Sequence, residues 1–228
     1  MTPSEPLILT DIAKRVGRGG SAKTVLDGLS VRFEPGALTM ITGASGAGKT
    51  TLLSVAGMLT APSAGEIRLG DLISAPRSSA GRLARQRRKA FGYLFQNAGL
   101  MGRMSALDNA IMPLRYSAVS ASERRRRGLD ALEQVGLSGA ARRTVDQLSG
   151  GERHRVAMAR LIAHAPPWMI CDEPTTGLDA GLGAQIVTLL RGFADAGHGV
   201  IAASHDPAVS ARADHRLDLG VSEPRLAA

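Results

Sequence analysis

Short apolar runs alternate along the chain with segments of helical spacing. Four runs have the length of buried strands: "LTMIT" (38–42), "FGYLF" (91–95), "WMIC" (168–171) and "GVIAAS" (199–204). The last two are almost continuously apolar, which is typical of parallel strands that are covered on both faces. The alternation predicts an α/β fold with a mainly parallel sheet.

The stretch from about residue 97 to residue 165 has a helical pattern throughout. One helix is predicted over 105–117, with Ser105 as its N-cap, and a second from near Ser120 to Gly136. A third should begin at Ser149 and stop before Pro166, because serine caps a helix start and proline cannot continue a helix. Residues 74–81 have the composition of a surface loop. We therefore expect one domain of 228 residues, in which a helical subdomain (97–165) is inserted into an α/β core (1–96 and 166–228).

A glycine-rich loop, "GASGAGKT", occupies positions 43–50. It satisfies the pattern G-x-x-x-x-G-K-[ST], follows the predicted strand 38–42 and precedes the helical pattern "TTLLSVAGML". In such a loop, backbone N–H groups surround phosphate oxygens, and the helix N-terminus adds the positive end of a dipole. The motif assigns Lys49 to the β- and γ-phosphates of a nucleotide and the Thr50 hydroxyl to Mg²⁺.

Two carboxylates, Asp172 and Glu173, directly follow the predicted strand 168–171. One acid at a strand end can hold the Mg²⁺ shell, while the next faces the other side and can polarise an attacking water. This pattern assigns Asp172 to the metal and Glu173 to general-base catalysis of nucleoside triphosphate hydrolysis. Cys171, inside the strand, is interpreted as a small buried hydrophobic residue.

Two further polar residues follow predicted strands: Gln96 after 91–95 and His205 after 199–204. Ligand-contacting residues of open α/β sheets lie at the carboxyl ends of strands. A lone glutamine or histidine is more often structural, but the position of both beside a nucleotide site favours ligand contact.

Charge and composition narrow the choice of partner. The net charge of +8 suggests nucleic acid or an anionic membrane surface, and no acidic residue lies between Asp71 and Asp108. Aromatic residues make up only 3% of the chain, too few for extensive base stacking, so we interpret the arginines as a solvated face and expect no nucleic acid. A single cysteine, no signal-peptide pattern and no apolar run near the ~18–20 residues that span a bilayer together favour a cytoplasmic location.

Taken in order, these segments resemble an ATP-binding cassette (ABC) ATPase. The resemblance extends over about Leu7 to Leu219 and rests on "GASGAGKT", Gln96, "LSGGE" (148–152), "WMICDE", "GLD" (177–179) and His205. It implies a P-loop NTPase core with an N-terminal antiparallel β part. It also implies ATP and Mg²⁺ as ligands, and a head-to-tail homodimer or heterodimer of ATPase subunits that encloses two ATP molecules.

The resemblance also assigns roles to individual residues. Gln96 would contact ATP and sense Mg²⁺, His205 would hold the γ-phosphate and the attacking water, and Asp179 would lie at the dimer seam. The signature residues Ser149, Gly150, Gly151 and Glu152 would contact the ATP of the partner subunit. The remaining contacts to the chain's own ATP would come from Gly43, Ala44, Ser45, Gly46, Ala47, Gly48, Lys49, Thr50 and Thr51.

Two longer stretches, "FGYLFQNAGLMGRMSALDNAIMPL" and "LSGGERHRVAMARLIAHAP", are most similar to the ATPases of lipoprotein-releasing, macrolide-exporting and division-associated systems. Those are separate chains that dock on a membrane permease, which implies an ATPase bound to the inner face of the cell membrane. With 228 residues we expect no added C-terminal regulatory domain. In the family the region after Gln96 receives helices of the permease, and its methionines (Met101, Met104 and Met112) suit an adaptable groove and a core equally well.

Three features depart from the family pattern. Val16 stands where adenine usually stacks on an aromatic residue, and His154 stands where glutamine is common. The stretch "PTTGLDAGLGAQ" differs from the "TGNLD" of the lipoprotein-releasing group. The substrate is therefore not determined by the resemblance.

Two other functions agree with parts of the sequence. A soluble ABC-type ATPase acting on nucleic acid or ribosomes would explain the basic charge, but chromosome-type members insert a very long coiled coil and ribosome-acting members usually carry two cassettes. A regulatory module that holds ATP without hydrolysing it would suit Val16, but Glu173 and His205 argue for hydrolysis.

Overall fold

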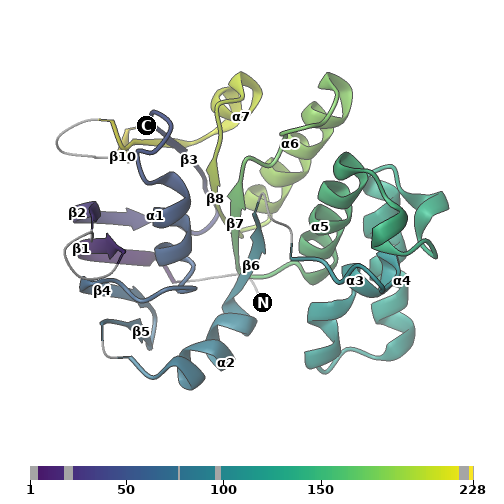
Figure 1. Cartoon of the computed structure of the whole chain (residues 1–228), viewed down its shortest axis with the longest axis horizontal. Coiled ribbons are helices and arrows are strands. Elements are labelled where there is room, and N and C mark those ends of the chain that lie inside the picture. The colour runs from purple at the N-terminus through teal and green to yellow at the C-terminus, as the bar shows by residue number, and fades with distance from the viewer. Residues whose placement is uncertain (1–4, 18–22, 77, 96–98, 221–225, 228) are drawn as a thin grey trace.

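The computed structural model describes residues 5–17, 23–76, 78–95, 99–220 and 226–227. In this part of the chain two sheets lie on either side of helix α1 (Lys49–Ala56) (Figure 1). The smaller sheet is antiparallel, with the order β2-β1-β4-β5: β1 (Leu7–Val16), β2 (Lys23–Phe33), β4 (Ala64–Leu69) and β5 (Leu72–Ser74).

The larger sheet has the order β10-β9-β3-β8-β7-β6. Neighbouring strands in it are parallel, except that β10 (Leu226–Ala227) pairs antiparallel with β9 (His215–Asp218). The others are β3 (Leu38–Thr42), β6 (Phe91–Leu94), β7 (Trp168–Asp172) and β8 (Gly199–Ala203). The four strands predicted from apolar runs are therefore confirmed, each within one residue or so at its ends.

The large sheet is buried on both faces, as its apolar sequence predicts. Along β7, Trp168 and Ile170 belong to the core that one face of the large sheet forms with α1 and the antiparallel sheet. Met169 and Cys171 belong to the core on the opposite face, which α6 (Ala180–Asp195) and α7 (Pro207–Arg212) cover. Because successive side chains of a strand point to opposite faces, only a strand covered on both sides needs every position apolar.

The helical segment lies beside β6 and β7 (Figure 1). It contains α3 (Ala106–Ala110), α4 (Ala121–Gln134) and α5 (Gly150–His164), with 3₁₀ turns at Met112–Tyr116, Ser138–Ala140 and Val145–Gln147. The three predicted caps are present: the hydroxyls of Ser105, Ser120 and Ser149 accept hydrogen bonds from the backbone N–H groups three residues on. These local hydrogen bonds are why serine marks a helix start in sequence.

Several predicted boundaries were wrong. The helix from Ser105 does not continue to residue 117, because Pro113 cannot join an α-helical ladder and the chain tightens into the 3₁₀ turn. The loop predicted at 74–81 is shorter, since Ser74 ends β5 and Ala80 begins α2 (Ala80–Ala90). The helix after the glycine-rich loop ends at Ala56, where Gly57 caps it.

Close contact between β7 and β8 depends on a glycine. Gly199 pairs with Trp168, and a Cβ at Gly199 would lie 2.3 Å from the indole ring. We expect Gly199→Ala to destabilise the fold by about 1–3 kcal/mol, because a buried ring on a central strand cannot yield without shifting the strand. Urea unfolding followed by the fluorescence of Trp168, the only tryptophan, measures this change.

Gly192 is the matched control for this substitution. It lies on an exposed face of α6, and a Cβ there would meet nothing within 4 Å. Gly192→Ala should leave the unfolding midpoint unchanged or raise stability by up to about 1 kcal/mol, because alanine favours helix. Equal midpoints for the two variants would contradict the packing argument.

Candidate functional site

The glycine-rich loop, the two carboxylates and His205 lie at one edge of the large sheet. Because β3, β7 and β8 are parallel, their carboxyl ends point the same way. The glycine-rich loop follows β3, the carboxylates lie at the end of β7, and His205 follows β8. Gln96 lies outside the described residues, so its predicted role as an ATP and metal contact stays a prediction.

The glycine-rich loop, residues 43–50, has a backbone that only glycine adopts easily. Gly43, Gly46 and Gly48 have φ values of 140°, 82° and 97°, in the region where a side chain is strained. Gly48 caps the start of α1, and a Cβ there would meet the Val25 side chain at 2.9 Å. The loop therefore presents backbone N–H groups around a helix N-terminus, which is suited to phosphate.

The ammonium group of Lys49 lies over the same loop. Its Nζ donates to the carbonyl oxygens of Gly43 at 2.7 Å and Ala44 at 3.2 Å. The positive charge is thus held beside the turn in which Ser45 and Ala47 stand, and Ala47 N donates to Ala44 O at 3.1 Å. A phosphate in this loop would meet both the N–H groups and the ammonium charge.

Two of the three predicted metal contacts, Thr50 and Asp172, touch each other, although they are 122 residues apart in sequence. The Thr50 hydroxyl donates to Asp172 Oδ2 at 2.7 Å, and Asp172 is only 7% exposed. Mg²⁺ prefers oxygen ligands and commonly takes one or two from protein, the rest coming from substrate phosphates and water. Among the described residues, no group of three or more histidine, cysteine or acidic side chains is arranged to hold a metal ion.

Glu173 has a strained backbone conformation at the end of β7. Its φ is 51°, in the left-handed region, which costs a non-glycine residue roughly 1–2 kcal/mol. Two backbone hydrogen bonds hold it there: Glu173 N donates to Ala203 O at 2.8 Å, and Thr176 N donates to Glu173 O at 3.2 Å. His205 Nε2 lies 3.9 Å from Glu173 Oε1, so the predicted base and the predicted γ-phosphate contact are neighbours.

Cys171, the residue before Asp172, is fully buried. Burial raises the pKa of its thiol to about 12, and the nearby charge of Asp172 adds to the effect. A thiol with such a pKa stays protonated at neutral pH. The prediction of a small hydrophobic residue, not a nucleophile, agrees with this environment.

Next to the glycine-rich loop is a hollow of about 420 Å³ between the end of β1 and the start of α1. Val16, which is 50% exposed, lines it together with Thr50 and Thr51. Sequence reasoning missed Lys14 and Arg15 in its lining; Lys14 Nζ is held by Thr60 Oγ1 at 2.7 Å and Ala61 O at 2.6 Å. The hollow is placed to receive the nucleoside of a nucleotide whose phosphates lie in the loop.

The start of α5, residues 149–152, forms a capping box at the N-terminus of that helix. Ser149 Oγ accepts from Glu152 N at 3.3 Å, and Glu152 Oε2 accepts from Ser149 N at 2.8 Å. These hydrogen bonds lower the pKa of the Glu152 carboxyl. The Arg143 guanidinium, 3.2 Å from Glu152 Oε1, lowers it further. Gly150 and Gly151 leave the first two positions of the helix without side chains. Asp179 caps α6 in the same way, accepting from Leu182 N at 2.9 Å.

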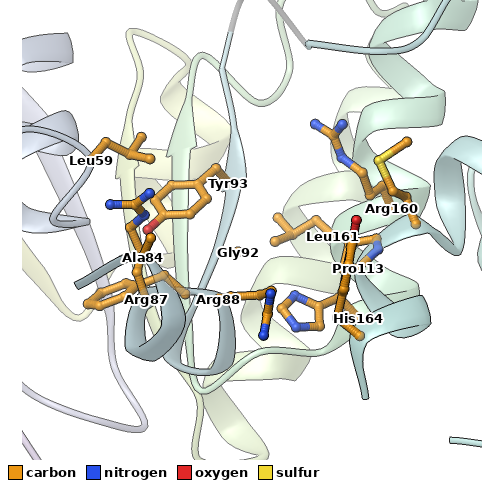
Figure 2. A pocket seen from close by; sticks show the side chains of 13 residues that line it. Leu59, Ala84, Arg87, Arg88, Gly92, Tyr93, Pro113, Arg160, Leu161 and His164 are labelled. Atoms are coloured by element: carbon orange, nitrogen blue, oxygen red, sulfur yellow. The ribbon is translucent and has the colours of Figure 1, made fainter. Parts of the chain in front are cut away.

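A groove of about 410 Å³ separates α2 and β6 from the helical segment (Figure 2). Arg87 and Tyr93 line one side, while Arg160 and His164 of α5 line the other. The Arg88 guanidinium lies 4.9 Å from the centre of the Tyr116 ring and so bridges the two sides. Burial lowers the pKa of His164 to about 4, so it is neutral at physiological pH.

The three methionines differ in environment. Met112 lines this groove, Met101 is 53% exposed, and Met104 is half-buried. The sequence missed the contribution of α2 to the groove, because the helix is so basic that it resembles a solvated segment. Elsewhere the arginines agree with that interpretation: on α4, Arg126 and Arg127 form ion pairs with Glu123, and Arg126 also with Asp130.

The sequence profile of the family described as ABC transporter matches residues 26–176. That span contains the glycine-rich loop, the start of α5 and both carboxylates. The chain belongs to the ABC transporter family.

Relatives of this cassette include two export proteins. It is 38% identical to the macrolide export ATP-binding/permease protein MacB of Burkholderia thailandensis, over 98% of this chain and 34% of that protein. It is 39% identical to the pyoverdine export ATP-binding/permease protein PvdT of Pseudomonas aeruginosa, over 96% of this chain and 33% of that one. The chain thus spans about a third of the length of the curated relatives it matches.

A solved structure matches the whole cassette. The dimeric ATP-binding cassette MJ0796, in a post-hydrolysis state bound to ADP and Pi, superposes with a TM-score of 0.88 at 30% identity and covers 97% of both chains. The predicted fold, a P-loop NTPase core with an antiparallel β part and an inserted helical segment, is confirmed. The cassette is an ABC ATPase, as its sequence resemblance implied. No helix of the described residues is long and apolar enough to cross a membrane.

Proposed function

We propose that this cassette binds ATP with Mg²⁺ and hydrolyses it as one half of a head-to-tail dimer. The observation that carries the proposal is the 2.7 Å contact between Thr50 and the buried Asp172, with Glu173 next in the chain. It brings together a phosphate loop, a pair of metal ligands and a base, which are the parts that phosphoryl transfer to water requires.

Each part of the chain has a defined task in this proposal. The loop N–H groups and Lys49 hold the phosphates, and Thr50 and Asp172 hold Mg²⁺, which when bound neutralises phosphate charge. Glu173 takes a proton from the attacking water, and His205 orients that water against the γ-phosphate. The backbone strain at Glu173 is met when the chain folds, so the residue is already in position before the reaction begins.

A dimer is proposed because the resemblance to ABC ATPases assigns Ser149, Gly150 and Gly151 to the ATP of a second cassette, with Asp179 at the seam. Ser149 and Gly150 are exposed at the start of α5, where a nucleotide bound to a second chain could reach them. The dimeric structures of the MJ0796 cassette support this arrangement.

We further propose that the cassette works on the inner face of a membrane and powers a permease. MacB and PvdT are each named as both ATP-binding and permease proteins, and this chain matches a third of each. The helical segment, residues 97–165, is proposed as the subdomain that transmits movement. The groove between it and the core is assigned to a cytoplasmic helix of the permease.

The groove has the chemistry of a helix-docking site. Its floor includes the apolar side chains of Phe91, Met112 and Leu161. Cations from Arg87, Arg88 and Arg160 line it, and no acidic residue is among its described lining. An amphipathic helix with acidic residues complements both the cations and the apolar side chains of the groove. The phosphates of a nucleic acid would pair with the cations but would not cover the apolar side chains.

Charge reversal at the groove tests this assignment. We expect Arg88→Glu to reduce co-purification of a polytopic membrane protein by about tenfold or more, because it repels an acidic partner and removes the contact to Tyr116. Tagged chains are recovered from the native host in mild detergent and the bound proteins are quantified. Arg85→Glu is the matched control, since Arg85 is exposed on the same helix but is not among the described residues that line this groove. Nucleic acid or ribosomes recovered in place of a membrane protein would favour the soluble alternative.

A further inference from the structure

One side chain joins the start of α5 to the loop that carries Glu173. His154 Nε2 lies 2.9 Å from the carbonyl oxygen of Pro174, the residue after Glu173. A carbonyl oxygen only accepts, so Nε2 carries the hydrogen and donates. Pro174 has no N–H, which leaves its carbonyl as the polar backbone group by which it can be held.

The same two segments meet a second time. A Cβ at Gly151 would lie 3.4 Å from Gly177 O, so the first turn of α5 packs closely on the loop after β7. Residues 149–151 are the part of α5 that we assign to the partner's ATP. The first two turns of α5 and residues 173–177 thus form one contact region between the two phosphate sites of a single chain.

Glu173 needs such support because its backbone is strained. The left-handed φ of 51° is maintained only by its surroundings: Ala203 O on one side and the turn to Thr176 on the other. Pro174 is buried, and His154 fixes its carbonyl. Release of that carbonyl would free the peptide unit that joins Pro174 to Thr175, one residue beyond Glu173, and so loosen the turn that directs the Glu173 carboxylate.

We propose that His154 is a positioning residue that couples the two nucleotide sites of one chain. When the start of α5 binds the partner's γ-phosphate, His154 carries that placement to Pro174 and holds Glu173 aligned on the chain's own ATP. This inference rests on the proposed function, in which the two sites serve different nucleotides.

Steady-state ATP hydrolysis by the full chain with Mg²⁺ tests the positioning role. We expect His154→Ala to lower kcat by about tenfold and to leave KM within about twofold, because small misplacement of a catalytic group slows chemistry without weakening phosphate contacts. His154→Gln should restore kcat to within about threefold of the unmodified chain, since its amide N–H can donate to the same carbonyl. A glutamine variant no better than alanine would overturn the inference.

His198 provides the matched control. Its Nδ1 makes the same kind of contact, 2.8 Å from Pro166 O, but at the opposite end of β7 from Glu173. His198→Ala should lower the unfolding midpoint about as much as His154→Ala and leave kcat unchanged. If both variants lower kcat equally, the effect is structural and the positioning role is wrong.

A double-mutant cycle tests the coupling itself. If His154 transmits the placement of α5, Ser149→Ala should lower kcat less in the His154→Ala chain than in the unmodified one. Effects on kcat that multiply independently would overturn the coupling. Hydrolysis by the unmodified chain separates the two proposals: its absence would overturn the proposed function, whereas normal hydrolysis that His154→Ala leaves intact would overturn only this inference.

Discussion

Replacement of Glu173 by glutamine is expected to lower the rate of ATP hydrolysis by about 10²–10⁴-fold while ATP binding persists. Glutamine has the same shape and the same branching, so it can occupy the left-handed backbone position as glutamate does. Its amide, however, cannot accept a proton from water. The substitution also removes the negative charge that lies 3.9 Å from His205 Nε2.

The structural consequence is an ATP-bound dimer that cannot open by hydrolysis. Phosphate release measures the catalytic loss, and size-exclusion chromatography with ATP and Mg²⁺ measures the dimer. Glu66→Gln is the control, because Glu66 lies on β4, away from the nucleotide loop, with its side chain 43% exposed and paired with Arg68. A Glu173→Gln chain that stays monomeric under these conditions would count against the head-to-tail arrangement.

Replacement of Lys49 by alanine should remove most of the affinity for ATP. Its ammonium group lies over the phosphate loop, 2.7 Å from Gly43 O, and charge-assisted hydrogen bonds to phosphate contribute about 1.5–3 kcal/mol each. Loss of one such hydrogen bond corresponds to an increase in Kd of about 10- to 100-fold, and loss of two hydrogen bonds gives a larger increase. Calorimetric titration with ATP and Mg²⁺ measures this directly.

Lys89→Ala is the charge-matched control for that titration. Lys89 is exposed near the end of α2 and lines neither the phosphate loop nor the hollow beside it. Its removal lowers the net charge of the chain equally but should leave Kd unchanged. An unaltered Kd in the Lys49→Ala chain would show that the loop does not bind phosphate in the proposed way.

The two ends of α5 illustrate what sequence patterns predict well. Ser149 and the pair Pro166-Pro167 bracketed the helix correctly, because a cap and a stop act over three or four residues. The strand 168–172 was equally predictable from its continuous apolar character. The role of Ser149 toward a partner's ATP stays a prediction, as does that of Gln96.

Helices α2, α6 and α7 escaped prediction, and the two longer ones did so for different reasons. Helix α2 has a buried Leu83 but is otherwise dominated by arginine and alanine, so it lacks a clear apolar stripe. Helix α6 contains three glycines, which disfavour helix, yet Ile186, Val187 and Leu190 pack against the large sheet. In α6 burial outweighs the cost of the glycines, and that burial exists only once the sheet has formed.

The sequence by itself determined the local chemistry of this protein: the phosphate loop, the helix caps, the apolar strands and the two carboxylates. Each of these depends on residues within a few positions of one another. Only the tertiary structure decided that Thr50 meets Asp172, that His154 holds Pro174 and that a cationic groove separates α2 from α5. Those contacts join residues far apart in the chain, and the order of the parallel strands, which no short pattern encodes, brings them together.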